Sequence, residues 1–101
     1  MNWELKETKE FEKQYDTVPS EIKWKFEKQF RRVKENPYQL GKPLCYPWFR
    51  ELKNDAFRVY YLIYDQKVVV LFVGVSSKKS QQMMINAIKN NLKRFKEFIG
   101  Q

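Results

Sequence analysis

Cations alternate with aromatic and aliphatic residues in a segment that has the pattern of a β-hairpin. Residues 49–53 (FRELK) are followed, after a turn at residues 54–56 (NDA), by residues 57–64 (FRVYYLIY). A second hydrophobic stretch then leads to residues 76–80 (SSKKS). Strands hold cations more firmly than loose tails do, and in a small domain such cations indicate a site for a polyanion.

The alternation of strand side chains predicts which residues accompany Arg58. Successive side chains point to opposite faces of a sheet, so Arg58 shares a face with Tyr60, Leu62 and Tyr64, opposite the face of Phe57. Two interpretations stay open at this stage. Arg58 is either a strand-edge arginine whose stem covers aromatic surface, or an arginine that binds phosphate.

The residue types that are missing exclude several classes of enzyme. The chain has no histidine, which excludes the Ser-His-Asp triad, the Cys-His pair and the usual zinc and two-histidine iron sites. Its three glycines are isolated, so no P-loop and no dinucleotide fingerprint is present. The carboxylates mostly accompany lysines and are interpreted as surface ion-pair partners. We therefore expect no metal and no cofactor, and cations or hydroxyls would have to carry any catalysis.

Length and charge set the broad class. A chain of 101 residues with 43% hydrophobic residues predicts one globular domain over residues 1–101. The net charge of +8 favours anionic partners, first nucleic acid and then acidic protein or lipid surfaces. The single cysteine, Cys45, and the absence of an apolar leader predict the cytoplasm. The longest apolar run, residues 68–75, is too short to span a membrane, so no membrane partner is expected.

The N-terminal third of the chain predicts a strand and two helices. Residues 3–6 alternate as a short strand, and Thr8 is a typical N-cap for a helix that carries Phe11 and Tyr15 on one face. Pro19 or Ser20 can open the next helix. The apolar stripe of that helix comprises Ile22, Phe26, Phe30 and Val33. The two helices should form a helical hairpin.

The rest of the chain predicts a three-stranded meander and one terminal helix. The hairpin of residues 49–64 turns at residues 65–66 into a strand over residues 67–75. A continuous amphipathic helix is predicted from Ser80 to Gly100. The fold class is thus α+β, with an antiparallel sheet packed on the N-terminal helical hairpin and the order β-α-α-β-β-β-α.

The hairpin and the residues that follow it resemble the RelE/ParE toxin superfamily, with RelE and the phage-type HigB branch as the most similar members. HigB proteins show a progression of Glu-Leu-Arg, Tyr-Arg and Lys-Lys-Thr-Gln. This chain has RELK at residues 50–53, FRVYY at 57–61, VVVL at 68–71 and KKSQ at 78–81. The resemblance covers nearly the whole chain. It implies a RelE/ParE-like fold and a toxin of a type II toxin-antitoxin pair, commonly an endoribonuclease (mRNA interferase) that cuts messenger RNA in the ribosome and so inhibits translation.

The resemblance also implies roles for individual residues. Arg58 matches the arginine of Tyr-Arg, Lys53 matches the basic residue of Glu-Leu-Arg, and Lys78 with Lys79 match the later basic pair. In the reaction that it implies, the RNA 2′-hydroxyl attacks the adjacent phosphate without a metal. Positive charge then stabilises the doubly charged transition state. Arg58 is expected to supply that charge.

The proton-transfer roles stay open between several residues. Crowded cations favour the neutral form of a lysine, so Lys53 is one candidate base and Glu51 is the other. The register of the hairpin decides which of the two faces the site. Lys78 is expected to stabilise charge or to donate a proton. The residues expected to contact RNA are Arg50, Tyr60, Lys79 and Gln81.

Three classes of function remain after this comparison. The first is the ribosome-dependent endoribonuclease. The second is a ParE-like toxin that inhibits DNA gyrase without cutting RNA; it is favoured by Met83-Met84, which stand where RelE-like proteins often have a catalytic tyrosine or histidine. The third is a basic interaction module without toxicity. For a toxin, the expected partners are an acidic antitoxin, in a hetero-oligomer, and the ribosome with its mRNA.

Other prominent residues are predicted to have structural roles. Trp24 and Trp48 are expected to pack against the fold, although stacking on nucleic-acid bases is the alternative. Cys45 is expected to act as a small apolar residue. Lys89, Lys93, Arg94 and Lys96 are interpreted as one solvated face of the last helix, which could also hold an acidic antitoxin segment or ribosomal RNA.

Overall fold

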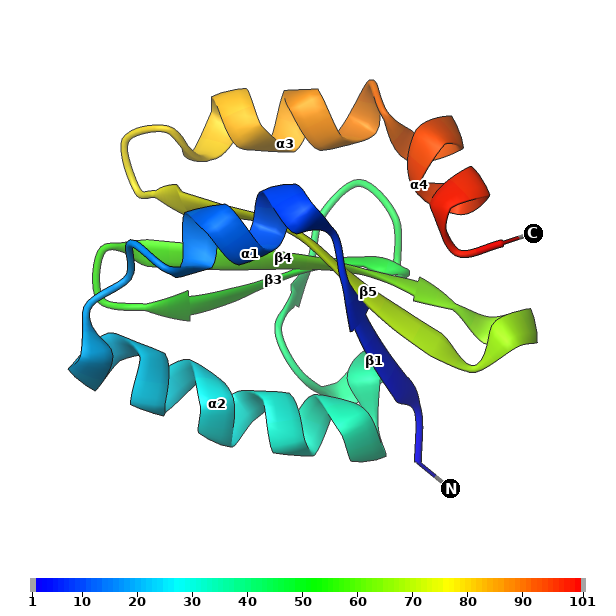
Figure 1. The fold of residues 1–101 in the computed structure, drawn as a ribbon, viewed down its shortest axis with the longest axis horizontal. Coiled ribbons are helices and arrows are strands. Elements are labelled where there is room, and N and C mark those ends of the chain that lie inside the picture. Colours follow the sequence, from blue (N-terminus) through cyan, green and yellow to red (C-terminus); the bar gives the residue numbers. More distant parts are fainter. Residues whose placement is uncertain (1, 101) are drawn as a thin grey trace.

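A five-stranded sheet runs through the middle of the molecule and carries helices on both faces (Figure 1). The computed structural model describes residues 2–100. Within them the strands are β1 (Glu4–Glu7), β2 (Lys42–Pro43), β3 (Phe49–Asn54), β4 (Phe57–Tyr64) and β5 (Val69–Ser77). The helices are α1 (Lys9–Tyr15), α2 (Ser20–Glu35), α3 (Gln81–Lys89) and α4 (Leu92–Phe98), with short 3-10 turns η1 (Pro37–Gln39) and η2 (Asp65–Lys67). The predicted α+β class is confirmed.

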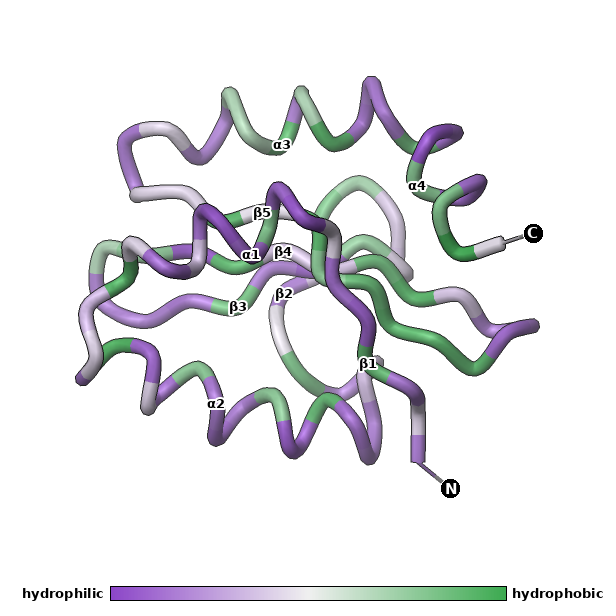
Figure 2. The backbone as a smooth tube through the Cα atoms, in the orientation of Figure 1, coloured by the Kyte–Doolittle hydropathy of each residue, from purple (hydrophilic) through white to green (hydrophobic). Residues whose placement is uncertain are grey.

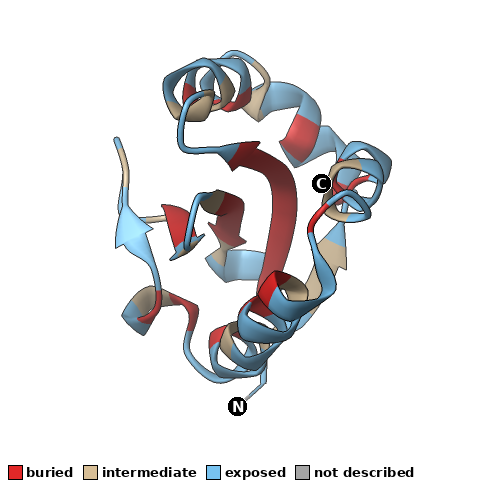
Figure 3. Cartoon of the chain, turned by 90° about the vertical axis from the view of Figure 1, so that its left-hand side faces the viewer, coloured by how far each residue is buried: buried red, intermediate tan, exposed pale blue. Residues whose placement is uncertain are grey.

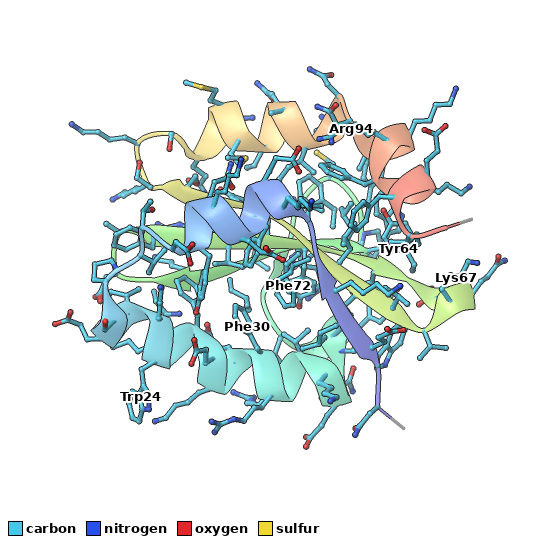
Figure 4. All side chains as sticks on the ribbon, viewed as in Figure 1. Trp24, Phe30, Tyr64, Lys67, Phe72 and Arg94 are labelled. Atoms are coloured by element: carbon cyan, nitrogen blue, oxygen red, sulfur yellow. The ribbon has the colours of Figure 1, made fainter. Side chains whose placement is uncertain are left out.

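The helical hairpin forms as the sequence predicts. The Thr8 hydroxyl accepts a hydrogen bond from the Phe11 backbone N–H at 3.0 Å, which satisfies one of the free donors at the start of α1. Pro19 occupies the N-cap position of α2. The stripe of α2 faces the sheet, and Phe30 meets Phe72 of β5 with ring centroids 4.6 Å apart (Figure 4). Both helices therefore cover the same face of the sheet.

The central strands form the predicted antiparallel meander. The strand order is β1-β5-β4-β3-β2, and β4 pairs antiparallel with β3 on one side and with β5 on the other. The β3–β4 turn consists of Asp55 and Ala56, and Asp55 adopts a positive φ of 52°, a conformation that aspartate tolerates better than most residues. The register places Lys53 opposite Arg58 and Glu51 opposite Tyr60.

Three features of the architecture differ from the sequence-based expectation. The edge strand β1 pairs parallel with β5, and the two-residue strand β2 adds a fifth member that was not predicted. The terminal helix is not continuous, because it breaks at Asn90 and Asn91 into α3 and α4. Asparagine has low helix propensity, while the apolar spacing continues through the break because both helices pack on the same surface.

Each face of the sheet has its own hydrophobic core. The first core lies under α1 and α2 and contains Val59 and Tyr61 of β4; the second lies under α3 and α4 and contains Tyr60 and Leu62. The predicted alternation of β4 is therefore confirmed. Figure 2 shows hydrophobic colour along much of β5, and Figure 3 shows buried residues in the strands of the sheet. No helix among residues 2–100 has the length and apolar character that crossing a membrane requires.

Candidate functional site

Two segments that carry predicted site residues, the β3–β4 hairpin end and the loop after β5, meet at one end of the sheet. The backbone N–H of Lys78 donates to the carbonyl of Ala56 at 2.7 Å, so the loop between β5 and α3 lies against the β3–β4 turn. Both segments lie on the left in Figure 1. The chain thus brings Lys53, Arg58 and Lys78 to the same end of the molecule.

Lys53 and Arg58 form a pair of like charges on the face that α3 covers. They are direct cross-strand partners, and like charges in this position destabilise a sheet. Among the described residues the ion pairs are Lys25–Asp55 and Arg94–Glu10, which involve neither of these cations. No carboxylate contact within residues 2–100 compensates the charge of the pair. Such an arrangement attracts an external anion.

The guanidinium group of Arg58 has one occupied and one free edge. Its Nη1 donates to the carbonyls of Asp55 at 3.0 Å and Phe57 at 3.1 Å, although the residue as a whole is only 4% exposed. Its Nε is buried and has no hydrogen-bond partner within residues 2–100, and no bond from Nη2 is found there either. An unsatisfied buried donor costs roughly 1–3 kcal/mol. The Nε–Nη2 edge has the geometry that binds two oxygens of a phosphate.

A buried polar network lies beside the two cations. The Glu51 carboxylate is buried and accepts a hydrogen bond from Gln81 Nε2 of α3 at 2.6 Å. Next to it, the hydroxyls of Tyr60 and Ser76 are 2.9 Å apart. Ser76 was not among the site residues predicted from the sequence. It joins the site because the β4–β5 register places it opposite Arg58.

The phenol of Tyr60 stays protonated in this network. Burial raises its pKa to about 12, the nearby Glu51 charge acts in the same direction, and the hydrogen bond with Ser76 and the charge of Arg58 oppose the shift. Tyr60 is fully buried, so the predicted contact between its side chain and RNA is wrong for this conformation. Tyr60 instead packs in the second core, next to the residues of the candidate site.

Arg50 requires the clearest correction. It lies on the opposite face from Lys53 and Arg58, and its guanidinium group is buried. Nε donates to Leu40 O at 2.7 Å, Nη1 to Pro47 O at 3.0 Å and Nη2 to Gly41 O at 3.2 Å. The loop before β3 therefore uses all three nitrogens. The guanidinium group of Arg50 is buried on the face away from Arg58, and its role is to hold that loop.

The lysine pair after β5 is exposed on a tight loop. The hydroxyls of Ser77 and Ser80 lie 3.0 Å apart, and each accepts a hydrogen bond from the backbone N–H of the other residue at 3.2 Å. Lys78 and Lys79 project from this loop into solvent. Their backbone is thus fixed, while their ammonium groups are free to follow a ligand.

The start of α3 contains no acid or base in the position implied by the resemblance. Met83 is 73% exposed, and Met84 packs over Gly74 of β5. Cys45, which was expected to act as a small apolar residue, is a free cysteine at an exposed position. Trp48 contributes to both cores as predicted, whereas Trp24 is 60% exposed, which contradicts the packing role expected for it.

A hollow of about 480 Å³ adjoins the lysine loop on the side of α1. It is bordered by Lys13, Thr17, Phe57, Ser76 and Ser80. Within residues 2–100 no group of three or more histidine, cysteine, aspartate or glutamate side chains is placed to hold a metal ion. The chemistry available at this end of the molecule is that of cations, hydroxyls and one buried carboxylate.

Comparison with known proteins gives matches at the level of structure. No protein-family model matches the chain, and no curated protein matches it. A variant of the toxin RelE from E. coli in its free state superposes with a TM-score of 0.74 at 22% identity, over 89% of this chain and 98% of that one. The toxin-antitoxin complex RelBE2 from Mycobacterium tuberculosis gives a TM-score of 0.64 at 20% identity, over 76% and 99%.

A third match comes from an archaeon. The RelE–RelB complex from Pyrococcus horikoshii superposes with a TM-score of 0.61 at 14% identity, over 76% of this chain and 96% of that one. At these identities the likeness concerns the fold, and it extends over nearly the full length of each matched chain. The resemblance to RelE drawn from the sequence is confirmed at this level: the chain has the RelE fold.

Proposed function

We propose that this chain is the toxin of a type II toxin-antitoxin pair and acts as a metal-independent endoribonuclease on mRNA in the ribosome. The fold supports the toxin class, because the matched structures are RelE toxins, several of them in complex with antitoxins. The observation that carries the nuclease proposal is the unpaired Nε of Arg58, which lies directly opposite Lys53 at the end of the sheet where Lys78 lies. Because this nitrogen is buried, the proposal requires a local opening at Arg58 before a phosphate can bind there.

The proposed reaction needs only positioned charge and proton transfer. The 2′-oxygen forms a bond to the adjacent phosphorus while the bond from phosphorus to the 5′-oxygen breaks. The products are a 2′,3′-cyclic phosphate and a 5′-hydroxyl. One base takes the 2′-proton and one acid protonates the leaving oxygen. The Arg58 guanidinium and the Lys78 ammonium would donate hydrogen bonds to the equatorial phosphate oxygens, where each well-placed donor is worth roughly 3–4 kcal/mol.

The two candidate bases are both on the face of Arg58, but they differ in access. Lys53 is exposed and reaches an RNA strand without rearrangement. Glu51 is buried and is held by Gln81, so it can act as a base only if that hydrogen bond opens. Lys78 is the proposed charge stabiliser or proton donor. Lys79 and Gln81 are proposed to contact the RNA.

Replacement of Arg58 tests this proposal. The Arg58→Ala variant should abolish growth inhibition and lower cleavage by roughly 10²–10³-fold, the usual effect of removing a transition-state donor. Arg58→Lys keeps the positive charge but lacks the two parallel N–H donors of a guanidinium group, so it should recover only part of the activity. Brief expression followed by primer extension on mRNA measures both, with cuts inside translated codons as the positive signal.

The control is Lys67→Ala, because Lys67 is an exposed cation on η2, at the end of β4 away from the candidate site. This variant should stay as toxic as the wild type. Thermal unfolding of each purified variant separates a lost function from a lost fold. Full toxicity of a folded Arg58→Ala variant would contradict the role of Arg58.

One observation favours a second candidate function. The beginning of α3 presents Met83 and Met84 where RelE-like proteins often carry a catalytic tyrosine or histidine, and Tyr60 is sealed in the core. A toxin of the ParE type, which inhibits DNA gyrase without cutting RNA, needs neither residue. Intact transcripts together with broken DNA after expression would favour this function over the nuclease.

The proposed partners follow from charge. The net charge of +8 suits an acidic antitoxin, and a complex with it is part of the proposal. The proposed location is the cytoplasm, where ribosomes and mRNA are available. The proposed domain organisation is a single toxin domain over residues 1–101.

A further inference from the structure

Trp24 is an isolated aromatic residue on the outer face of α2. It is 60% exposed, and Figure 4 shows it projecting from α2 on the side away from the sheet. The Lys28 ammonium lies 3.7 Å from the centroid of the ring, in a cation-π contact. One face of the indole is thus occupied by a cation, which leaves the other face for a ligand.

The surroundings of Trp24 are charged. The residues three and four positions away along the helix are Ser20, Glu21, Glu27 and Lys28, none of which is hydrophobic. Protein-protein interfaces have an apolar core of several residues, and this surface has a single aromatic residue among ions. The exposed cations of α2 are Lys25, Lys28, Arg31, Arg32 and Lys34, and its exposed carboxylates are Glu21, Glu27 and Glu35. Cations outnumber carboxylates on the exposed surface of the helix, and an exposed aromatic ring stacked on a cation is an arrangement that binds single-stranded nucleic acid.

The surface of α2 is connected to the proposed cleavage site. Lys25, the neighbour of Trp24, contacts Asp55 at the tip of the β3–β4 hairpin with 3.3 Å between Nζ and Oδ2. The carbonyl of the same Asp55 accepts the hydrogen bond from Arg58 Nη1. Gln29 of α2 also accepts a hydrogen bond from Asn54 at 2.7 Å. The first half of α2 and the Arg58 site therefore lie on two sides of one hairpin tip, the end of the molecule that faces the viewer in Figure 3.

We propose that Trp24 is an RNA-binding residue that stacks on an unpaired base of the cleaved strand, beyond the hairpin tip from the cleaved linkage. The strand leaves the Arg58 site, passes over the hairpin tip and reaches α2, where Lys28 and Arg31 bind its phosphates. This inference rests on the proposed function, because the RNA is the same strand. The inference adds an RNA contact on α2, the helix that covers the face of the sheet opposite the cleavage site.

Binding of a non-cleavable RNA tests the inference. The probe is a fluorescent single-stranded 2′-O-methyl RNA decamer, and the measurement is its anisotropy at low and moderate salt. Trp24→Ala should weaken binding roughly tenfold, and Trp24→Phe should recover most of the loss, because a phenyl ring also stacks. The salt dependence should stay the same in Trp24→Ala, since no phosphate contact is removed.

Phe98 gives the matched control, because it is 52% exposed on α4 and Phe98→Ala removes a similar exposed ring. That variant should bind like the wild type. Equal affinities of Trp24→Ala and the wild type would overturn the inference, as would failure of the wild type to bind the decamer. Displacement of the decamer by poly-glutamate from the wild type but not from Trp24→Ala would overturn it in favour of an acidic protein.

The outcome is separable from that of the proposed function. If Trp24→Ala loses affinity while the wild type leaves transcripts intact in cells, the RNA surface stands and the nuclease proposal fails. If the wild type cuts transcripts and Trp24→Ala binds and cuts equally well, only the Trp24 contact fails.

Discussion

Two arginines on neighbouring strands show how the available partners decide the role of a residue. Arg50 and Arg58 are both almost completely buried and both lie on strands of the central meander. Each of the three nitrogens of Arg50 donates a hydrogen bond to a backbone carbonyl inside the protein. Arg58 finds carbonyls for one nitrogen only. The first arginine therefore stabilises the fold, and the second has an Nε with no hydrogen-bond partner within residues 2–100, as the proposed phosphate contact requires.

The structural role of Arg50 leads to a prediction about stability. Arg50→Ala removes three charge-assisted hydrogen bonds and leaves the carbonyls of Leu40 and Gly41 without these donors, so the free energy of unfolding should fall by about 3 kcal/mol. Urea unfolding measures this loss. Arg32→Ala on the exposed face of α2 is the control, and it should change the free energy by less than about 0.5 kcal/mol. An unchanged midpoint for Arg50→Ala would show that the three hydrogen bonds contribute nothing net.

At the scale of elements, the short strand β2 depends on one glycine. Gly41 precedes β2 and has a φ of +68°, which side chains other than glycine rarely adopt. A Cβ at this position would lie 2.8 Å from the backbone oxygen of Glu51. The close approach matters because Glu51 pairs with Lys42 of β2 and also belongs to the candidate site.

Gly41→Ala should therefore destabilise the protein more than its backbone conformation alone requires. The positive φ costs roughly 1–2 kcal/mol, and the contact with a backbone atom adds to it, because that atom cannot rotate away. Gly100→Ala is the matched control, since Gly100 has a φ of +81° but nothing within 4 Å of a Cβ. The difference in urea midpoint between the two variants measures the contact. Equal losses would show that the loop before β2 relaxes at no cost.

Most elements were predictable because their signals are local. A short stretch of sequence was enough to predict the cap at Thr8, the apolar stripe of α2 and the alternation in β4. All three are confirmed. The strand β2 has only two residues, one of them proline, so no periodicity exists to detect it. The parallel pairing of β1 with β5 joins strands more than sixty residues apart, which no local pattern encodes.

The candidate site was predictable only in part for the same reason. The placement of Lys53 and Arg58 on one face follows from strand alternation and hairpin register. The burial of Arg50 depends on where the loop of residues 40–47 folds back, and the exposure of Trp24 depends on which side of α2 meets the sheet. The first is a tertiary property. The second had a local signal, because Trp24 is two residues from both Ile22 and Phe26 and therefore lies on the side of α2 opposite the predicted apolar stripe.

At the scale of the whole molecule, tyrosines connect the two cores to the surrounding elements. Tyr61 lies in the first core and donates to the carbonyls of Pro37 and Leu40, at 2.7 and 3.0 Å. Tyr60 lies in the second core, and Tyr64 packs against it. Burial raises the pKa of all three phenols to about 12. Their protonated form is therefore a condition of the native packing on both faces of the sheet.

This condition predicts a loss of stability at alkaline pH. An unfolded tyrosine has a pKa near 10, so above about pH 10 the unfolded chain loses protons that the folded chain retains. The stabilisation from the raised pKa values is complete below pH 10 and is lost as the pH rises through about 12. Each unit of pKa difference corresponds to about 1.4 kcal/mol for each tyrosine. Urea midpoints measured across this range should fall steeply, together with the appearance of tyrosinate absorbance.

Tyr64→Phe isolates this effect from the titration of the lysines, which is the same in both proteins. The pKa of Tyr64 is raised by burial alone, and no hydrogen bond of its hydroxyl is found within residues 2–100. The variant should unfold at nearly the wild-type urea concentration at neutral pH and should lose less stability than the wild type between about pH 10 and 12. Parallel curves for the two proteins over this range would show that Tyr64 ionises equally well in the folded chain, and that the core on the side of α4 admits water.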